Sequence, residues 1–203
     1  MAKLIKSSLG EMTADIIRER IIDNEYPSGM RIREDELSRE FDISRICVRE
    51  ALLILERENL LERGGNKPCC VRRFTEKNVM DLLKFRSTLE TAAAAECIKT
   101  DRIPEKELKT CISRMRMLHE RDASSKEYLE ADIAFHDTLI RSLDNDYFNL
   151  SWDTVRSQYL TLMHALYKVR SDEFSSGFAA HLRIAELIFS KETGEAVKFI
   201  ERH

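Results

Sequence analysis

The sequence predicts a mainly α-helical protein in which a small β-hairpin separates two groups of helices. Apolar residues recur at helical spacing along most of the chain. The 203 residues include only 6 Gly and 3 Pro, which disfavours a turn-rich all-β fold. The helical pattern is interrupted by extended runs on either side of a Gly/Asn/Pro segment near residue 65. The length suits one large domain or two small ones, each able to bury a core.

Composition narrows the class of protein further. The 33 Lys and Arg against 36 Asp and Glu give a formal charge of -3, so any nucleic-acid binding must come from local patterning. No run approaches the roughly 20 apolar residues that span a bilayer, and the N-terminus lacks the apolar run of a signal peptide. We therefore expect cytoplasmic localisation without a membrane partner. The cysteines lack C-x-x-C spacing, which favours reduced thiols over disulfides or a thiolate zinc site.

Three helices are predicted before the hairpin. Apolar residues at helical spacing predict the first over 12–25, ending at the turn sequence Tyr26-Pro27-Ser28-Gly29. The second is expected from about Arg33 to Phe41 and the third from about Arg45 to Asn59. Ser44 is the predicted N-cap of the third helix, because its hydroxyl can accept a backbone N–H of the first turn. The buried stripe of that helix is expected to comprise Val48, Leu52 and Leu55.

The hairpin that follows carries a local positive charge. Residues 1–75 hold 14 basic and 14 acidic side chains, so this half is not basic as a whole. The segment from Arg63 to Thr75, in contrast, contains basic residues and no acidic one. The basic residues are Arg63, Lys67, Arg72 and Arg73. Three helices followed by a basic hairpin predict a winged helix-turn-helix, which is a DNA-binding fold.

The third helix is the expected recognition helix. Arg45 and Arg49 lie one turn apart on one face, and an arginine there can bond guanine through two donors or hold a phosphate. Lys67 of the wing would contact the backbone or the minor groove. The alternative is that these arginines form surface ion pairs with Glu50 or Glu56. The order of the elements, the Ser44 cap and the acid-free wing favour DNA binding.

A long helical stretch without strand alternation follows. The pattern predicts helices near 76–84, 86–100, 105–122, 125–143, 147–169, 173–190 and 193–203. These form an all-α second domain. The predicted domains are a DNA-binding domain over 1–74 and an all-α domain over 75–203.

One pair in the second domain has the spacing of metal ligands. Asp132 and His136 are four residues apart, which places them on one helix face, one turn apart. His181 and His203 lie on later predicted helices. Imidazole nitrogens with a carboxylate oxygen suit Zn, Ni, Fe or Mn. From spacing alone a local Asp–His hydrogen bond is the more common explanation.

The first half resembles the DNA-binding domain of GntR-type bacterial transcription regulators. Pro27 and Gly29 match the Pro-x-Gly that precedes the family's second helix, and residues 44–52 match its recognition-helix pattern. The resemblance implies DNA contacts from Ser44, Arg45, Cys47 and Arg49. Ile46-Cys47 stands where Thr-Pro or Thr-Thr is common, and Asn66 where the wing tip usually has Gly, so the operator sequence is not carried over.

The second half resembles the FCD effector domain of the FadR branch of this family, an all-α bundle. Metal-binding members use Asp-x-x-x-His followed by two later histidines, so the resemblance implies the ligands Asp132, His136, His181 and His203. Arg86 matches an arginine near the family's ligand pocket. His203 is the last residue of the sequence, and a terminal turn frays easily.

The function expected is a ligand-responsive regulator, a repressor by default. It would bind a palindromic operator as a homodimer, and a metal with a small carboxylate metabolite in the second domain. The alternative is a metal-dependent hydrolase attached to a DNA-binding head. Such an enzyme needs a base beside the metal-bound water, and Glu130 points roughly 200° around the helix from Asp132. A third class, the architectural DNA-binding protein, would show little sequence preference.

Overall fold

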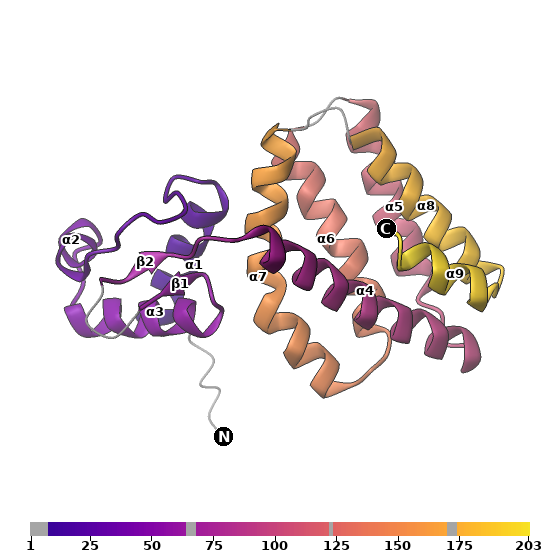
Figure 1. The fold of residues 1–203 in the computed structure, drawn as a ribbon, viewed down its shortest axis with the longest axis horizontal. Helices are drawn as coiled ribbons and strands as arrows, with labels where there is room; N and C mark the ends of the chain where they lie inside the picture. Colours follow the sequence, from indigo (N-terminus) through magenta and orange to yellow (C-terminus); the bar gives the residue numbers. More distant parts are fainter. Residues whose placement is uncertain (1–7, 64–67, 122–123, 170–173) are drawn as a thin grey trace, which may run out of the picture. The chain divides into compact units, whose positions relative to one another are not determined.

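The computed structural model in Figure 1 is mainly helical and describes residues 8–63, 68–121, 124–169 and 174–203. The chain divides into two compact units. The first is Met1–Thr75 with Thr154–Thr161, and the second is Glu76–Asp153 with Leu162–His203. The mainly helical fold class predicted from the sequence is confirmed, whereas the exact domain limits 1–74 and 75–203 stay a prediction.

The first unit contains three helices, α1 (Leu9–Ile22), α2 (Glu34–Glu40) and α3 (Arg45–Arg57). The Ser8 side chain caps α1 and Ser44 caps α3, where its Oγ accepts a hydrogen bond from Cys47 N at 3.2 Å. The fully buried stripe of α3 packs with apolar residues of α1 in one core. The residues of this stripe are Val48, Ala51, Leu52 and Leu55. The α3 face on the other side is thereby left for other contacts.

The hairpin consists of β1 (Leu61–Glu62) and β2 (Cys70–Val71), which pair in antiparallel register with Leu61 opposite Val71. The segment before α2 lies along β2 through backbone hydrogen bonds, among them Gly29 N to Val71 O at 2.8 Å. Gly29 has a φ of 83°, a conformation that favours glycine, and a Cβ there would collide with the Arg73 guanidinium. The segment with the Pro-x-Gly pattern therefore connects the helix-turn-helix to the wing through backbone hydrogen bonds.

The second unit begins with α4 (Glu76–Lys99), a single helix of 24 residues. The prediction of two helices, near 76–84 and 86–100, was wrong. The segment has no Gly or Pro that would end a helix at residue 85, and one face stays buried across this point. Leu82, Arg86 and Leu89 lie on that face. Arg86 therefore lies in the middle of a helix and not at its start.

The remaining helices of the chain follow the predicted ranges within a few residues. They are α5 (Glu105–Glu120), α6 (Ser125–Arg141), α7 (Asp146–Val169), α8 (Phe174–Phe189) and α9 (Thr193–Ile200). The last helix ends at Ile200 and not at His203, although His203 N still donates to Phe199 O at 3.1 Å. The core includes Ala93, Leu108, Phe135, Ile184 and Ile188 from α4, α5, α6 and α8. None of the described helices is both long and apolar enough to traverse a bilayer.

Candidate metal centre and nucleic-acid interface

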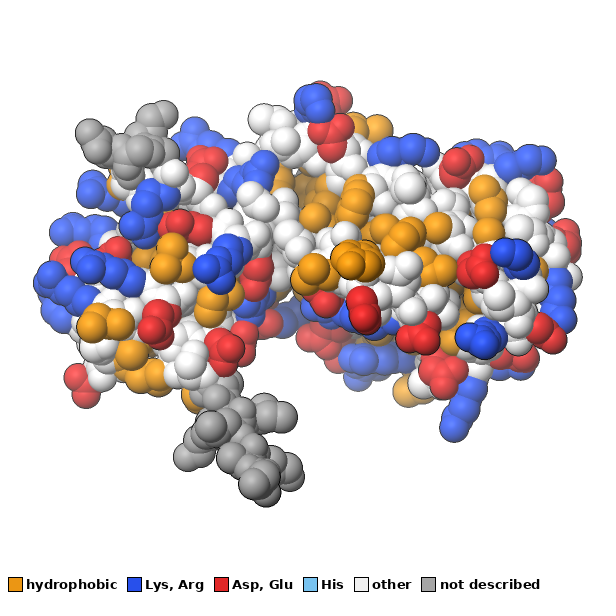
Figure 2. All heavy atoms as spheres, turned by 90° about the horizontal axis from the view of Figure 1, so that it is seen from below, with side chains coloured by type: hydrophobic (Ala, Val, Ile, Leu, Met, Phe, Trp, Pro, Cys, Tyr) orange, Lys and Arg blue, Asp and Glu red, His pale blue; other side chains and the backbone are white. Residues whose placement is uncertain are grey.

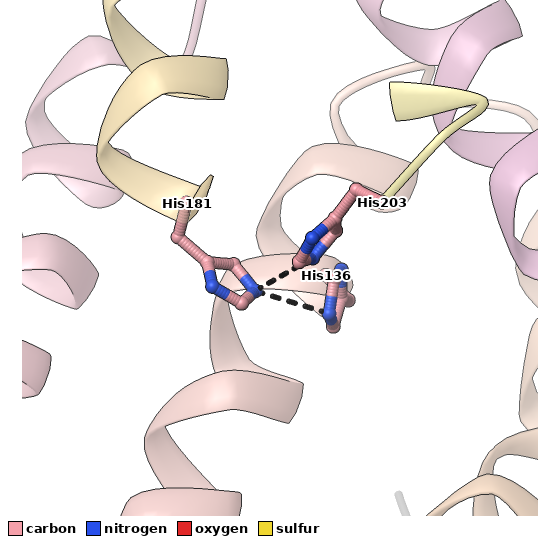
Figure 3. Close-up of side chains that lie close together, drawn as sticks. All are labelled: His136, His181 and His203. Carbon is pink, nitrogen blue, oxygen red and sulfur yellow. Dashed lines mark hydrogen bonds between the residues drawn. The ribbon is translucent and has the colours of Figure 1, made fainter. Parts of the chain in front are cut away.

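Three imidazoles from distant parts of the chain converge inside the second unit. His136 lies on α6, His181 on α8, and His203 follows α9, and Figure 3 shows their rings pointing toward one another. His181 Nε2 lies 3.2 Å from His136 Nε2 and 3.3 Å from His203 Nε2. The Asp132 carboxylate joins them, with Oδ1 3.3 Å from His181 Nε2 and Oδ2 3.5 Å from His136 Nε2. The residues predicted as ligands thus lie together.

Hydrogen bonds on the far side of two rings decide which nitrogen faces the centre. His181 Nδ1 lies 2.6 Å from Gly177 O, and since a carbonyl only accepts, Nδ1 carries the proton. His136 Nδ1 likewise donates to the Glu90 carboxylate. A neutral ring then presents its Nε2 lone pair to the centre. The lone pair of His181 therefore faces an Asp132 oxygen that also can only accept.

The electrostatics of the site keep two of the rings neutral. Burial disfavours the imidazolium form and lowers the pKa of His181 to about 4 and that of His203 to about 2. Burial acts in the same direction on His136, but the carboxylates of Glu90 and Asp132 outweigh it and raise the His136 pKa above its ordinary value. Although burial opposes ionisation of Asp132, the positive charge of His136 holds its pKa well below the usual range.

Glu90 is a member of the site that the sequence prediction missed. It lies on α4, one turn after Arg86, and its side chain is 1% exposed. Burial opposes its ionisation, but the positive charges of His136 and Arg86 lower the Glu90 pKa to about 2. A carboxylate that accepts from a histidine Nδ1–H is the usual orienting partner of a metal-binding imidazole. The signal in the sequence was the Arg86-x-x-x-Glu90 spacing.

Arg86 points into the same cluster. Its side chain is buried, its Nη1 lies 3.3 Å from His136 Nε2, and its Nε lies 3.6 Å from Glu90 Oε2. The predicted ligand-binding arginine is therefore at the candidate metal centre itself. An anion bound between the centre and Arg86 would contact both.

The donor atoms fit a transition metal. At metal–nitrogen distances of 2.0–2.1 Å, the ligand atoms of a tetrahedral site lie about 3.3 Å apart. Four separations in the cluster, 3.2 to 3.5 Å, are close to this value, and the three imidazole donors all lie within 4.8 Å of one another. The His181 Nε2 lone pair also faces Asp132 Oδ1 with no proton between them, and a bound cation would satisfy both acceptors. The residues that could hold a metal are Asp132, His136, His181 and His203.

The predicted DNA contacts of the first unit gather at the start of α3. Ser44 and Arg45 are exposed and Cys47 is half-buried, with Ser44 Oγ 3.2 Å from Cys47 Sγ. Arg49 follows one turn later with 63% of its side chain exposed. Lys67 lies outside the described residues. On the face drawn in Figure 2, Lys and Arg side chains gather over the first unit, with acidic side chains among them.

The ion pairs around α3 are not the ones with Glu50 or Glu56 that were the alternative explanation for its arginines. Arg49 pairs with Glu34 of α2, with Nε 2.7 Å from Oε2, and not with Glu50 or Glu56. Glu56 binds Arg63 at the base of the wing, with Oε1 2.8 Å from Nε. The acid-free wing is therefore partly neutralised by acidic side chains of the helices. The described residues provide no ion pair for Arg45, which leaves its charge available.

The geometry does not favour the hydrolase alternative. Glu130 is half exposed and pairs with Arg114, its Oε2 3.3 Å from Nη2, on the face of α6 away from the histidines. The carboxylates at the cluster itself, Glu90 and Asp132, each contact a ring nitrogen. Both therefore serve the histidines, and neither is placed as a free base for water.

The chain combines a winged helix-turn-helix with a helical bundle that contains a buried cluster of candidate metal-binding side chains. This combination is typical of one class of protein, the DNA-binding transcription regulators that sense small molecules. Family models agree with this assignment. The model described as bacterial regulatory proteins, gntR family, matches residues 9–71, and the FCD domain model matches residues 81–203. The chain therefore belongs to the GntR family of transcription regulators, in the FadR-type branch with an FCD domain. The matched families are regulators and not enzymes.

Curated relatives and solved structures resemble the chain over nearly its whole length. The gluconate operon transcriptional repressor of Bacillus subtilis (strain 168) is 29% identical, over 98% of this chain and 84% of that protein. The Bacillus licheniformis repressor of the same name is 28% identical with the same coverage. E. coli McbR/YncC has a TM-score of 0.78 at 16% identity, covering 97% of this chain and 95% of that one. A GntR protein from Rhodococcus sp. RHA1 has a TM-score of 0.76 at 20% identity, covering 97% and 93%.

Proposed function

We propose that the protein is a repressor that binds a palindromic operator as a homodimer and is released by a small carboxylate bound at a metal in its FCD domain. The single observation that carries the ligand half of the proposal is the convergence of three histidines, Asp132 and Arg86 in a buried cluster. The repressor assignment is supported by the two Bacillus relatives, which are gluconate operon transcriptional repressors.

The DNA half of the proposal rests on the exposed face of α3. Arg45 and Arg49 project from its first turns, where a recognition helix meets base edges in the major groove. Ser44 and Cys47 lie at the same end and would contact the phosphate backbone or the edges of neighbouring bases. A homodimer presents two such helices to half-sites about one helical turn apart, which is why the operator should be palindromic.

The metal half rests on the chemistry of the donor atoms. When bound, a divalent ion such as Zn, Ni, Fe or Mn would supply a Lewis-acidic centre for an anionic ligand. Three histidines and Asp132 would hold it, and Glu90 would orient His136. The positive charges of the ion and Arg86 exceed the negative charges of Glu90 and Asp132. A carboxylate compensates this excess, which supports a sugar acid such as gluconate as the first compound to test.

Binding of a ligand changes operator affinity only if the ligand prefers one arrangement of the dimer. Arg86 supplies a physical reason for such a preference. In the cluster its Nη1 lies 3.3 Å from His136 Nε2, the nitrogen that would bind the metal. The guanidinium must then direct this donor elsewhere, and an anionic ligand offers the acceptor. The position of Arg86, and with it α4, would therefore depend on the ligand.

Selection of bound fragments from a random DNA pool is expected to yield a palindrome. Arg49→Ala should lower affinity for the selected operator about 5- to 150-fold for each half-site, since a two-donor contact to guanine is worth about 1–3 kcal/mol. Affinity is measured by titration at fixed salt. Arg57→Ala, which removes an exposed arginine at the other end of α3, is the matched control and should have a smaller effect. Recovery of fragments without common sequence would support an architectural protein instead.

Glu90→Gln should lower the metal affinity of the protein about 10- to 100-fold, because the amide cannot orient and polarise His136 as a carboxylate does. Metal content after purification and competition with a chelator measure this change. Glu96→Gln on the same helix removes a half-exposed carboxylate that pairs with Lys99 and should bind metal normally. Equal affinity for both variants would mean that Glu90 does not act on the metal.

Metal binding should release a proton from His136 at pH values below its raised pKa, because His136 alone among the three rings has a raised pKa and must lose its Nε2 proton to bind the ion. Calorimetry in buffers of different ionisation enthalpy counts this proton. Release should decline toward zero as the pH rises through the raised pKa of His136, since the free site is then already deprotonated. Release that grows with pH would contradict this assignment of protons.

Gluconate should raise the melting temperature of the metal-loaded protein and lower its operator affinity, whereas the uncharged sugar alcohol sorbitol should do neither. Arg86→Lys keeps a positive charge but loses the planar fork that holds a carboxylate, so the thermal shift should shrink while metal content stays normal. Melting curves with matched metal analysis measure both. If no carboxylate shifts the melting temperature of the loaded protein, the ligand class is wrong.

A further inference from the structure

One ion pair of the first unit joins the two helices of the helix-turn-helix. Glu34 lies in the first turn of α2, and its Oε2 is 2.7 Å from Nε of Arg49 on α3. The Glu34 side chain is 24% exposed, whereas that of Arg49 is 63% exposed. The carboxylate is thus the more firmly held partner, and the guanidinium extends from it toward solvent.

The second oxygen of Glu34 faces the wing. Its Oε1 lies 3.7 Å from Nη2 of Arg63, and the Arg63 Nε is held 2.8 Å from Glu56 Oε1 of α3. The Glu34 carboxylate is therefore fixed from both sides, by α3 and by the start of the hairpin. Such a fixed carboxylate restricts the rotamers of Arg49, which otherwise has a long and flexible side chain.

The N–H group of Arg49 that binds Glu34 determines which of its other N–H groups remain available for DNA. A guanidinium presents Nε and the two Nη groups as donors in one plane. With Nε occupied by Glu34, the edge formed by Nη1 and Nη2 stays available, and two parallel N–H groups match O6 and N7 of guanine. Arg45 has no such partner among the residues that the structure describes. In the protein without DNA, the guanidinium plane of Arg49 is therefore oriented by Glu34, whereas that of Arg45 is not oriented by any described partner.

We infer that Glu34 is a positioning residue for sequence specificity: it holds Arg49 so that the guanidinium end reads one guanine of each operator half-site. The inference rests on the DNA contact proposed for Arg49. An exposed pair of this kind adds little to folding stability, so its effect belongs to DNA recognition. The negative charge of Glu34 also weakens attraction to phosphates on any sequence, and so lowers non-specific affinity. Both effects increase discrimination between the operator and other DNA.

The test compares Glu34→Gln and Glu34→Ala with the parent protein on two duplexes, the selected operator and the same operator with the guanine opposite Arg49 replaced. Both variants should bind the altered duplex more tightly than the parent does, because a negative charge is removed. The ratio of the two affinities should fall about fivefold or more, as Arg49 loses its fixed plane. Repeated fragment selection should lose base preference at that one position and keep it elsewhere.

Glu36→Gln is the matched control. Glu36 lies on the same helix and pairs with Arg33, its Oε1 3.1 Å from Nη1, so the variant removes the same charge without touching Arg49. It should raise affinity for both duplexes and leave their ratio unchanged. If the Glu34 variants behave in the same way as Glu36→Gln, Glu34 acts through charge alone and the inference is overturned.

A second comparison separates this inference from the role of Arg49. Arg49→Ala should abolish preference at the same operator position, and adding Glu34→Ala to it should cause no further loss there. If Arg49→Ala removes the preference but Glu34→Ala and Glu34→Gln leave it intact, the positioning role alone fails. If Arg49→Ala leaves the preference intact, the proposed DNA contact fails, and the inference with it.

Discussion

The candidate metal centre depends on one hydrogen bond, from His181 Nδ1 to the carbonyl of Gly177 one turn earlier on α8. Because a carbonyl cannot donate, this bond fixes the proton on Nδ1 and directs the Nε2 lone pair inward. The ring then faces Asp132 Oδ1, another acceptor, at 3.3 Å. Burial prevents the ring from relieving this conflict by protonation, since it lowers the His181 pKa to about 4. A bound cation would satisfy both acceptors, and His136 and His203 lie beside them as further ligands.

The same chemical pair, a carboxylate with an arginine, has different consequences in the two units because the surroundings differ. Glu90 and Arg86 are buried, so their charges act at low dielectric and change the protonation of neighbouring histidines. Glu34 and Arg49 are in contact with solvent, where water and salt weaken the attraction. The buried pair can therefore change the protonation of the histidines, whereas the exposed pair can only orient the Arg49 guanidinium. A solvated ion pair suits a DNA-binding surface because it can be exchanged for contacts to DNA at small cost.

Much of the architecture could be predicted because it depends on local patterns. The Ser44 cap, the stripe through Val48 and Leu52, and the Asp132–His136 spacing are each encoded within a few residues, and a single helix places them correctly. The continuity of α4 was missed because apolar periodicity weakens at a buried face that includes Arg86 and Glu90. A polar residue in an apolar stripe suggests that the helix ends there, unless its buried partners are known. For the same reason Glu90 was not recognised as part of the site.

Contacts between elements could not be read from one sequence. The pairing of Arg49 with Glu34 depends on the angle between α2 and α3, which is set by the core beneath them and not by residue spacing. The continuity of α4 also bears on how a ligand signal could leave the second unit. Arg86 lies ten residues after Glu76, about 15 Å along one uninterrupted helix, and Glu76 directly follows the segment that leaves β2. An unbroken helix transmits rotation or displacement at Arg86 to its first turn, whereas a break at residue 85 would have absorbed it. The helix that holds Arg86 is thus joined to β2 of the wing by four residues, Arg72 to Thr75.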